Sequence, residues 1–289
     1  MTAAGLTYRQ VDVFADAPLA GNGLAVFITK EPLGGQLMQA LTCELRQFES
    51  IFLWPASESN CYSARVFTME EELPFAGHPA IGAAAVLHEQ SGQLDYACKL
   101  LLPAGGLAMT SRRTGQGYHV SMKQAPVSFG IEIDVGEAGR WLKAFGLEGD
   151  HLDSRLPLCV ASTGLPYLVL PVTSEGLAKA RIADADLEQT LAAVGAKFAY
   201  LYDVGAREGR TWDNAGAVED IATGSAAGPV AGLLVRHGLA ALGERIVLQQ
   251  GRFVGRPSEM TVEVGEGGAV ILSGNVTTVA RSTFDAAVA

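Results

Sequence analysis

The sequence predicts an α+β protein with two similar domains, in each of which a sheet wraps around a central buried helix. The chain has 289 residues, which suits two domains of roughly 140 residues better than one core. The predicted order of elements occurs twice: strand, glycine-rich loop, strand, helix, strand, loop, buried helix and strand meander. Two helices lack a polar face, and such helices belong in a core. Their small side chains let strands approach closely, so we infer a helix wrapped by a sheet in each domain.

The first copy of this order lies before Lys123. Alternating side chains predict a strand over residues 8–14, and a turn-rich loop leads to a short buried strand at 24–28. Leucine and phenylalanine at helical spacing predict an amphipathic helix over residues 34–48. The remaining elements expected here are strands at 50–55 and 63–67, the buried helix from about 79 to 88, and a meander at 100–102, 106–110 and 118–122.

The second copy starts after a boundary at residues 123–126. A proline-containing loop at residues 162–166 precedes a strand at 167–170, as the glycine loop does in the first copy. The other expected elements are helices at 135–145 and 187–194, a strand at 198–203, the buried helix to about 237, strands at 245–250, 260–264 and 269–272, a turn at 273–275 and a last strand at 276–283.

Two matching loops, residues 72–79 and 219–226, lead into the two buried helices. Gly77 and Gly224 stand at the same place in the repeat. A helix start has free backbone N–H groups and the positive end of the helix dipole, and glycine lets a ligand come close. Two such starts are suited to a carboxylate. Each loop taken singly is also compatible with an ordinary helix cap, with Thr223 or Ser225 as the capping oxygen.

Three side chains are candidates for proton transfer. Glu49 is expected at the end of the helix over residues 34–48, where the dipole and apolar neighbours would raise its pKa into the range of a general base. His78 lies on the first turn of a buried helix, which favours a neutral imidazole able to relay protons. Asp220 is a second acid. The alternatives are a solvated glutamate, a satisfied interior histidine and an aspartate that braces a helix start.

Composition and motifs narrow the class of protein. The formal net charge of −10 argues against nucleic acid as a partner, although backbone dipoles can hold small anions in an acidic protein. Residues 1–10 do not have the pattern of a signal peptide, and a run of about 18 apolar residues is missing, so we expect a cytoplasmic protein without a membrane partner. The four cysteines lack metal-site spacing, and nucleotide and zinc-protease motifs are missing. We therefore expect no cofactor and no metal.

Several segments together resemble the PhzF-like family, which is named for the phenazine-biosynthesis isomerase and shares the diaminopimelate epimerase fold. The resemblance covers the chain from about Tyr8 to the last strand. It is carried by Asp12-Val13-Phe14 with Gly21-Asn22, Phe48-Glu49-Ser50, Leu73-Pro74-Phe75-Ala76-Gly77-His78-Pro79, Ser162-Thr163-Gly164-Leu165-Pro166 and Glu219-Asp220 with Ala222-Thr223-Gly224-Ser225-Ala226-Ala227-Gly228-Pro229.

The resemblance implies a domain of residues 1–123 with 275–289 and a second domain of residues 124–274, because the last strand crosses back to the first domain. It also implies that each domain is a barrel-like, mostly antiparallel sheet around a central buried helix, that the active-site cleft lies between the domains, and that the protein is a homodimer. In the phenazine enzyme a glutamate that matches Glu49 moves a proton between ring carbons of a dihydro-hydroxyanthranilate, and residues that match His78, Asp220 and Ser225 support the site. The resemblance therefore implies proton transfer by Glu49, on a substrate that the sequence does not name. The substrate-binding positions that follow from it are Asn22, Gly77, Gly224 and Ser225.

Two departures separate branches of the superfamily. Diaminopimelate epimerases place a cysteine before the glycine of each loop, where this chain has Ala76 and Thr223. Neither can act as a thiolate base, which argues against two-cysteine racemisation. The family usually has proline after the aspartate, whereas this chain has Ile221, so the backbone at Asp220 is less restrained.

The sequence therefore predicts a cofactor-independent isomerase that shifts a proton on a small carboxylate-bearing substrate. One alternative is a racemase or epimerase of an amino or hydroxy acid, with Glu49 as one base and another residue as the second. Two further alternatives are a small-molecule binding protein that uses the same cleft and a structural subunit of an oligomer.

Overall fold

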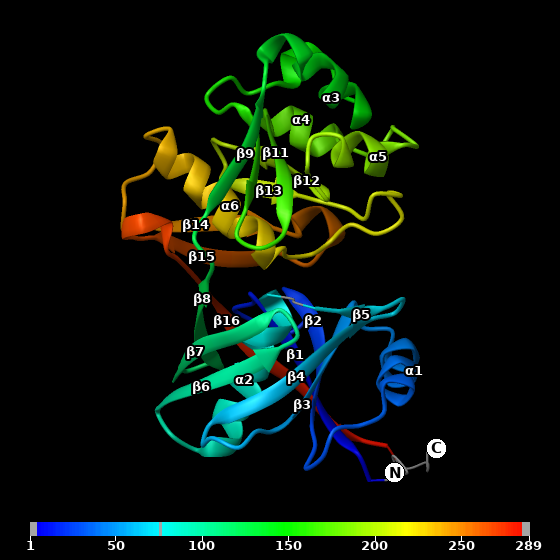
Figure 1. The fold of residues 1–289 in the computed structure, drawn as a ribbon, viewed down its shortest axis with the longest axis vertical. Helices are drawn as coiled ribbons and strands as arrows, with labels where there is room; N and C mark the ends of the chain where they lie inside the picture. Colours follow the sequence, from blue (N-terminus) through cyan, green and yellow to red (C-terminus); the bar gives the residue numbers. More distant parts are fainter. Residues whose placement is uncertain (1–4, 75–76, 285–289) are drawn as a thin grey trace. The chain divides into compact units, whose positions relative to one another are not determined.

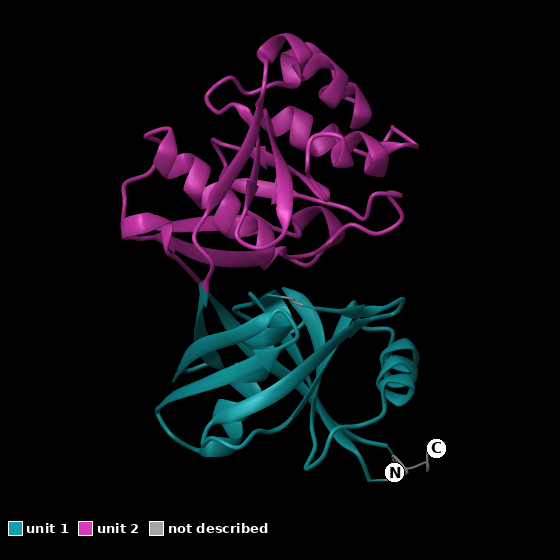
Figure 2. Ribbon diagram, in the orientation of Figure 1, with its two compact units in different colours: residues 1–123, 273–289 teal, residues 124–272 magenta. Residues whose placement is uncertain are grey.

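The computed structural model describes residues 5–74 and 77–284, so Phe75 and Ala76 lie outside the described residues. The chain forms two compact units, residues 1–123 with 273–289 and residues 124–272 (Figure 2). Each unit contains a sheet and a central helix, and the predicted α+β class is confirmed.

Unit 1 is a closed barrel around a helix (Figure 1). Its strands follow the order β1-β2-β3-β4-β6-β7-β8-β16, and β1 also pairs with β16, which closes the ring. The bounds are β1 Thr7–Val13, β2 Asn22–Ile28, α1 Gly35–Leu45, β3 Glu49–Pro55, β4 Cys61–Thr68, β5 Glu72–Leu73, α2 Gly77–Ser91, β6 Asp95–Leu102, β7 Gly105–Arg113, β8 Tyr118–Gln124 and β16 Val270–Thr283.

Helix α2 fills the barrel because its side chains are small. It is buried along most of its length and packs against β1, β2, β3, β6 and β7. A Cβ atom added at Gly82 would lie 2.4 Å from Cδ2 of Leu24 and 3.0 Å from Cγ2 of Val13. The glycine is therefore needed for the close approach of helix and strands.

Helix α1 covers the outer face of the barrel. Met38 and Leu41 of α1 pack with Phe27 and Phe52, which come from β2 and β3. The helix ends earlier than expected, because Arg46 takes a left-handed conformation with φ 49° and closes it. The predicted end near residue 48 is wrong, and Glu49 is the first residue of β3.

Unit 2 also has strands around a central helix, α6, with more helices outside, but its strand order ends at β9 without a closing pair among the described residues. From β16, its strands follow the order β15-β14-β13-β12-β11-β10-β9, and α6 packs on β10, β11 and β15. The bounds are β9 Ser128–Ile133, α3 Ala138–Ala144, β10 Leu158–Ser162, β11 Pro166–Val172, α4 Ser174–Lys179, α5 Leu187–Ala192, β12 Phe198–Asp203, β13 Glu208–Arg210, α6 Gly224–Arg236, β14 Arg245–Gln250 and β15 Ser258–Val264. Short 3-10 turns lie at Val135–Glu137, Gly149–His151, Arg252–Val254 and Glu266–Gly268.

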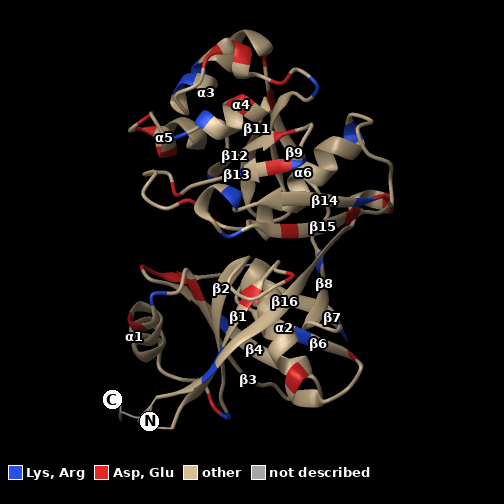
Figure 3. Ribbon diagram, turned by 180° about the vertical axis from the view of Figure 1, so that it is seen from behind, with Lys and Arg blue, Asp and Glu red and all other residues tan. Residues whose placement is uncertain are grey.

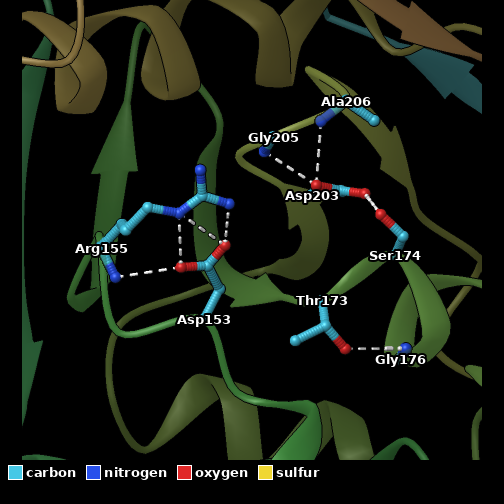
Figure 4. Close-up of polar contacts among 8 residues, drawn as sticks. All are labelled: Asp153, Arg155, Thr173, Ser174, Gly176, Asp203, Gly205 and Ala206. Atoms are coloured by element: carbon cyan, nitrogen blue, oxygen red, sulfur yellow. Dashed lines mark hydrogen bonds and ion pairs between the residues drawn. The ribbon is translucent and has the colours of Figure 1, made fainter.

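A polar cluster holds the loops at the ends of β11 and β12 (Figure 4). The Asp203 carboxylate accepts hydrogen bonds from the next turn's backbone N–H groups at 2.8 and 3.0 Å and from the Ser174 hydroxyl. Asp153 binds the guanidinium and backbone N–H of Arg155, and this contact holds the pKa of Asp153 below its usual range. Protein donors occupy both carboxylates, so the cluster is structural.

The two units share the position of their parallel strand pairs. In unit 1, β2 pairs with β3 and β4 pairs with β6 in parallel. In unit 2 the corresponding pairs β11–β12 and β13–β14 are parallel. The repeat predicted from the order of elements is therefore present in the sheet topology.

The last strand differs from the prediction. Residues 273–275 do not form a turn, because β16 runs unbroken over Val270–Thr283, from unit 2 into unit 1. Glycine is needed at residue 274 because the strand packs closely on Phe14, and a Cβ there would lie 2.3 Å from Cδ1 of that ring. The expected domain boundaries at 123 and 275 stay a prediction.

Charged residues are distributed over both units (Figure 3). The excess of ten acidic over basic residues is therefore not confined to one of them. Within residues 5–74 and 77–284, the helices are too short or too polar to cross a membrane.

Candidate functional site

Three predicted site residues of unit 1 come together at the start of α2. Asn22 begins β2 and Glu49 begins β3, and the parallel register of these strands brings their starts side by side. His78 lies on the first turn of α2. Its Nδ1 is 3.4 Å from Oε2 of Glu49 and 3.5 Å from Nδ2 of Asn22. All three residues are buried, with exposures of 0% for Asn22, 6% for Glu49 and 5% for His78.

The histidine in this cluster is neutral. Burial lowers the pKa of His78 to about 3, because the imidazolium loses its hydration. Its Nδ1 faces the Glu49 carboxyl at 3.4 Å. Its Nε2 is buried and has no hydrogen-bond partner among the described residues. The pair thus unites a carboxylate with a neutral imidazole, a combination suited to general acid–base chemistry.

The expected environment of Glu49 is only partly right. The carboxylate does not follow a helix C-terminus, because α1 ends at Leu45 and Glu49 is in a strand. The helix-dipole argument for this residue is therefore wrong. Its backbone lies in an apolar strand, where Ile51 and Phe52 are fully buried.

An ion pair braces the loop that precedes α2. Arg65 on β4 binds both carboxylate oxygens of Glu72, at 2.7 and 2.5 Å, and its guanidinium lies 5.1 Å from the centroid of the Phe67 ring. Glu72 is thus held in place by this pair. This bidentate pair fixes the chain five residues before Gly77.

The predicted residues of unit 2 form a second cluster, at the start of α6. Helix α6 begins at Gly224, and Thr223 makes no side-chain capping bond. The Thr223 hydroxyl instead donates to Oδ2 of Asp220 at 2.6 Å. The Ser225 hydroxyl lies 2.7 Å from the hydroxyl of Tyr167 on β11. Both hydroxyls are therefore used for side-chain contacts, and the simple capping interpretation does not describe this loop.

Two residues that the sequence did not single out hold this loop. The side-chain amide of Gln250 contacts Asp220 and Thr223, and the hydroxyl of Tyr200 donates to Oε1 of Gln250 at 3.0 Å. Gln250 is 1% exposed on the buried face of β14. The sequence did carry a signal for Gln250, because this glutamine stands at a position of the alternating strand where an apolar side chain is expected.

An ion pair also braces this second loop. Arg210 on β13 binds both oxygens of Glu219 at 2.8 Å, and its guanidinium stacks on Trp212 with 4.6 Å to the ring centroid. Arg65 and Phe67 have the same spacing and the same partner type in unit 1. The two braces repeat each other, and both precede a helix start by five residues.

Comparisons with known proteins agree with these observations. Residues 11–282 match the family described as phenazine biosynthesis-like protein. A trans-2,3-dihydro-3-hydroxyanthranilate isomerase from Pseudomonas chlororaphis is 33% identical, over 96% of this chain and 98% of the relative. An uncharacterized isomerase from Pasteurella multocida is 31% identical, over 93% of this chain and 90% of the relative.

Solved structures show the same fold. A predicted epimerase from Pseudomonas aeruginosa has a TM-score of 0.92 and 51% identity, over 96% of this chain and 99% of that one. A hydroxyproline epimerase from Agrobacterium vitis has a TM-score of 0.60 and 14% identity, over 96% and 91% of the two chains. This distant match confirms the epimerase-like fold and nothing beyond it.

Proposed function

Because the chain belongs to the phenazine biosynthesis-like family and is an isomerase, we propose that it moves a proton on a small carboxylate-bearing substrate, without a cofactor and with Glu49 as general acid and base. The Glu49 carboxylate takes a proton from a carbon next to an activating group. The same proton, or one exchanged with solvent, returns to another carbon of the conjugated system. The composition of the substrate does not change, so the step needs no oxidant or second substrate.

The observation that carries this proposal is the buried contact between Glu49 and His78. Oε2 of Glu49 and Nδ1 of His78 are 3.4 Å apart, and the histidine is neutral. Burial keeps the imidazole neutral, so the proton stays with Glu49 and the substrate, while the ring beside the carboxyl holds it in position. Asn22, 3.5 Å from the same nitrogen, orients the ring.

We propose that backbone N–H groups at a helix start bind the substrate carboxylate, and each unit offers one such start. These groups belong to Gly77 and His78 in unit 1 and to Gly224 and Ser225 in unit 2. Each start is the positive end of a buried helix, which supports this role. Asp220 would position the substrate or relay a proton.

The test is turnover of trans-2,3-dihydro-3-hydroxyanthranilate, the compound in the name of the Pseudomonas relatives. Glu49→Gln keeps the shape of the side chain and removes the base. We expect turnover to fall by about 10²–10⁴-fold, the usual contribution of a positioned acid–base group, with binding of the substrate largely intact. Glu71→Gln, on an exposed residue of the neighbouring loop, is the matched control. Turnover by Glu49→Gln near that of the wild type would end the assignment of Glu49.

A second candidate is an epimerase of an amino or hydroxy acid, favoured by the relative with 51% identity that is named a predicted epimerase. The hydroxyl of Thr223 is engaged by Asp220 and Gln250, so Thr223 would not serve as the second base. Solvent deuterium distinguishes the two reactions. Positional isomerisation places the label at a new ring carbon, whereas epimerisation places it at the stereocentre with inversion.

A further inference from the structure

Gln250 is an amide on a buried apolar face. It ends β14, where Ile246 and Leu248 point to the same interior, and all three are at most 1% exposed. An amide in such a place must have its hydrogen bonds satisfied by protein groups. Gln250 has four such contacts within unit 2, two on each end of the amide.

Backbone partners fix which way the amide points. The N–H of Thr223 can only donate, and it lies 3.1 Å from Oε1 of Gln250. The carbonyl of Asp220 can only accept, and it lies 2.8 Å from Nε2 of Gln250. The flipped amide would face a donor with a donor and an acceptor with an acceptor, so only one orientation is compatible with both contacts.

This orientation determines the direction of the next hydrogen bond. Nε2 of Gln250 also donates to Oγ1 of Thr223 at 2.9 Å. The hydroxyl of Thr223 therefore has its own hydrogen available, and Oδ2 of Asp220 lies 2.6 Å away to accept it. On the other side, Tyr200 donates to Oε1 of Gln250. The result is a one-way chain of donors that ends on the Asp220 carboxylate.

The backbone around Gln250 meets the same loop. Gly251 has φ 84°, and a Cβ atom there would lie 2.7 Å from the carbonyl oxygen of Ile221. The residue after Asp220 is Ile221, which lacks the ring by which proline restrains a backbone. Gln250 and Gly251 thus supply contacts that hold the loop on this side.

We infer that Gln250 is a positioning residue for the reaction, which acts through Thr223 to keep a hydrogen-bond donor on Asp220. The inference rests on the proposed function, in which Asp220 serves the substrate. In this scheme the carboxylate keeps one geometry through turnover, and Gln250 does not touch the substrate. Replacing the amide by a carboxyl group of the same shape leaves at most one donor for two acceptors, the Asp220 carbonyl and Oγ1 of Thr223. The Thr223 hydroxyl can then turn toward residue 250 and leave Asp220.

The experiment compares four variants with the wild type in the turnover assay. Gln250→Glu removes donors from residue 250, Thr223→Val removes the hydroxyl, and Thr223→Ser retains it. The double variant Gln250→Glu/Thr223→Val tests whether both act through one contact. Gln39→Glu is the matched control, since the Gln39 amide also donates to a backbone carbonyl, at 2.7 Å, but in unit 1 on α1. Far-ultraviolet circular dichroism confirms that each variant is folded.

We expect Gln250→Glu and Thr223→Val each to lower kcat by about tenfold, the effect of losing one hydrogen bond to a charged group, with KM within about threefold of the wild-type value. The double variant should be no slower than Thr223→Val, whereas Thr223→Ser and Gln39→Glu should keep the wild-type kcat. Losses that multiply in the double variant, or a kcat of Gln250→Glu within twofold of the wild type, overturn the inference. If Gln250→Glu does not fold, equal kcat values for Thr223→Val and Thr223→Ser overturn it. Each of these outcomes occurs in an active enzyme and leaves the assignment of Glu49 to its own test.

Discussion

The loops before α2 and α6 have the same frame, an arginine–glutamate pair ahead of the helix start, but they carry different polar residues at the helix start itself. In each, an arginine two residues before an aromatic residue binds a glutamate five residues before the helix start. Unit 1 places the buried pair Glu49 and His78 at its helix start. Unit 2 places Asp220 there, within a network of Thr223 and Gln250. The duplicated frame is therefore separable from the chemistry, and each half has specialised within it.

The difference concerns where protons can move. In unit 1, a carboxylate and a neutral imidazole lie in contact, and Nε2 of His78 is left without a partner among the described residues. In unit 2, the donors and acceptors of Gln250 match those of its neighbours in one arrangement only. Under the proposed function, Glu49 transfers the proton in unit 1, and the Asp220 carboxylate keeps a fixed position in unit 2.

The largest expected loss of unfolding free energy follows from breaking the ion pair before α6, and the matching pair before α2 should matter much less. Arg210 and Glu219 have side chains only 9% and 10% exposed, whereas Arg65 and Glu72 are 31% and 33% exposed. Arg210→Met leaves a buried carboxylate without its partner and should cost about 3–5 kcal/mol of unfolding free energy. Arg65→Met should cost about 1 kcal/mol or less, because water screens the exposed pair. Urea unfolding, with amide hydrogen exchange to locate the weakened unit, measures both.

The double variant Arg210→Met/Glu219→Gln is the control for this comparison. It removes the stranded charge and should recover part of the lost stability. Equal losses for Arg65→Met and Arg210→Met would mean that burial does not distinguish the braces.

A smaller loss of stability is expected when the small residues of the two central helices are enlarged. Alanine at Gly82 would meet Leu24 and Val13 inside a closed ring of strands, with the nearest atom at 2.4 Å. Alanine at Gly228 would meet Oε1 of Gln124 at 2.6 Å and Cγ2 of Thr163 at 2.7 Å, but in a unit whose strand order ends at β9 without closing into a ring among the described residues. We expect Gly82→Ala to destabilise the protein by about 1–3 kcal/mol, and Gly228→Ala by less. Thermal melting of both variants checks this order, and the reverse order would contradict the difference in packing.

The third comparison concerns pH. His78 has a pKa of about 3 in the folded protein, below its ordinary value of 6.5. Between these values the unfolded chain binds a proton at this residue and the folded protein does not, so stability falls as the pH falls. The slope from this residue is at most about 1.4 kcal/mol per pH unit.

In His78→Gln this slope should disappear between pH 6.5 and 3, and unit 2 offers no matching histidine at its helix start. Urea titrations at several pH values measure the difference between wild type and variant. An unchanged slope would show that the folded protein already holds His78 as an imidazolium beside the Glu49 carboxylate.

The sequence predicted the frame because the frame rests on local signals. Gly77 and Gly224 recur at one place in the repeat, and each does begin a buried helix. Alternation located β14 at residues 245–250, as the structure has it. Small residues in two helices indicated the strands packed around them.

Other features depend on contacts between distant residues. Arg46 ends α1 through a left-handed backbone that its side chain does not signal, which placed Glu49 wrongly at a helix end. Ser-Gly-Asn at 273–275 has turn chemistry, but the ring of Phe14 requires an extended glycine there. Gln250 lies 27 residues from Thr223 and 50 from Tyr200, so only the folded sheet brings them together. The grouping of Asn22, Glu49 and His78 followed from the resemblance, and the parallel register of β2 and β3 supplies its physical reason.

The unbroken strand β16 affects the order in which the two units can complete their folding during synthesis. Residues 276–283 pair with β1, which leaves the ribosome before unit 2, so all of unit 2 is synthesised between the two pairing segments. Until residues 276–283 emerge, the barrel of unit 1 lacks one strand, and the edges of β1 and β8 that pair with this strand stay unpaired. The half that is translated first is thus the half that closes last. Loss of a short stretch at the carboxyl end, through a premature stop or a protease, would damage the half of the molecule that contains Glu49 and His78.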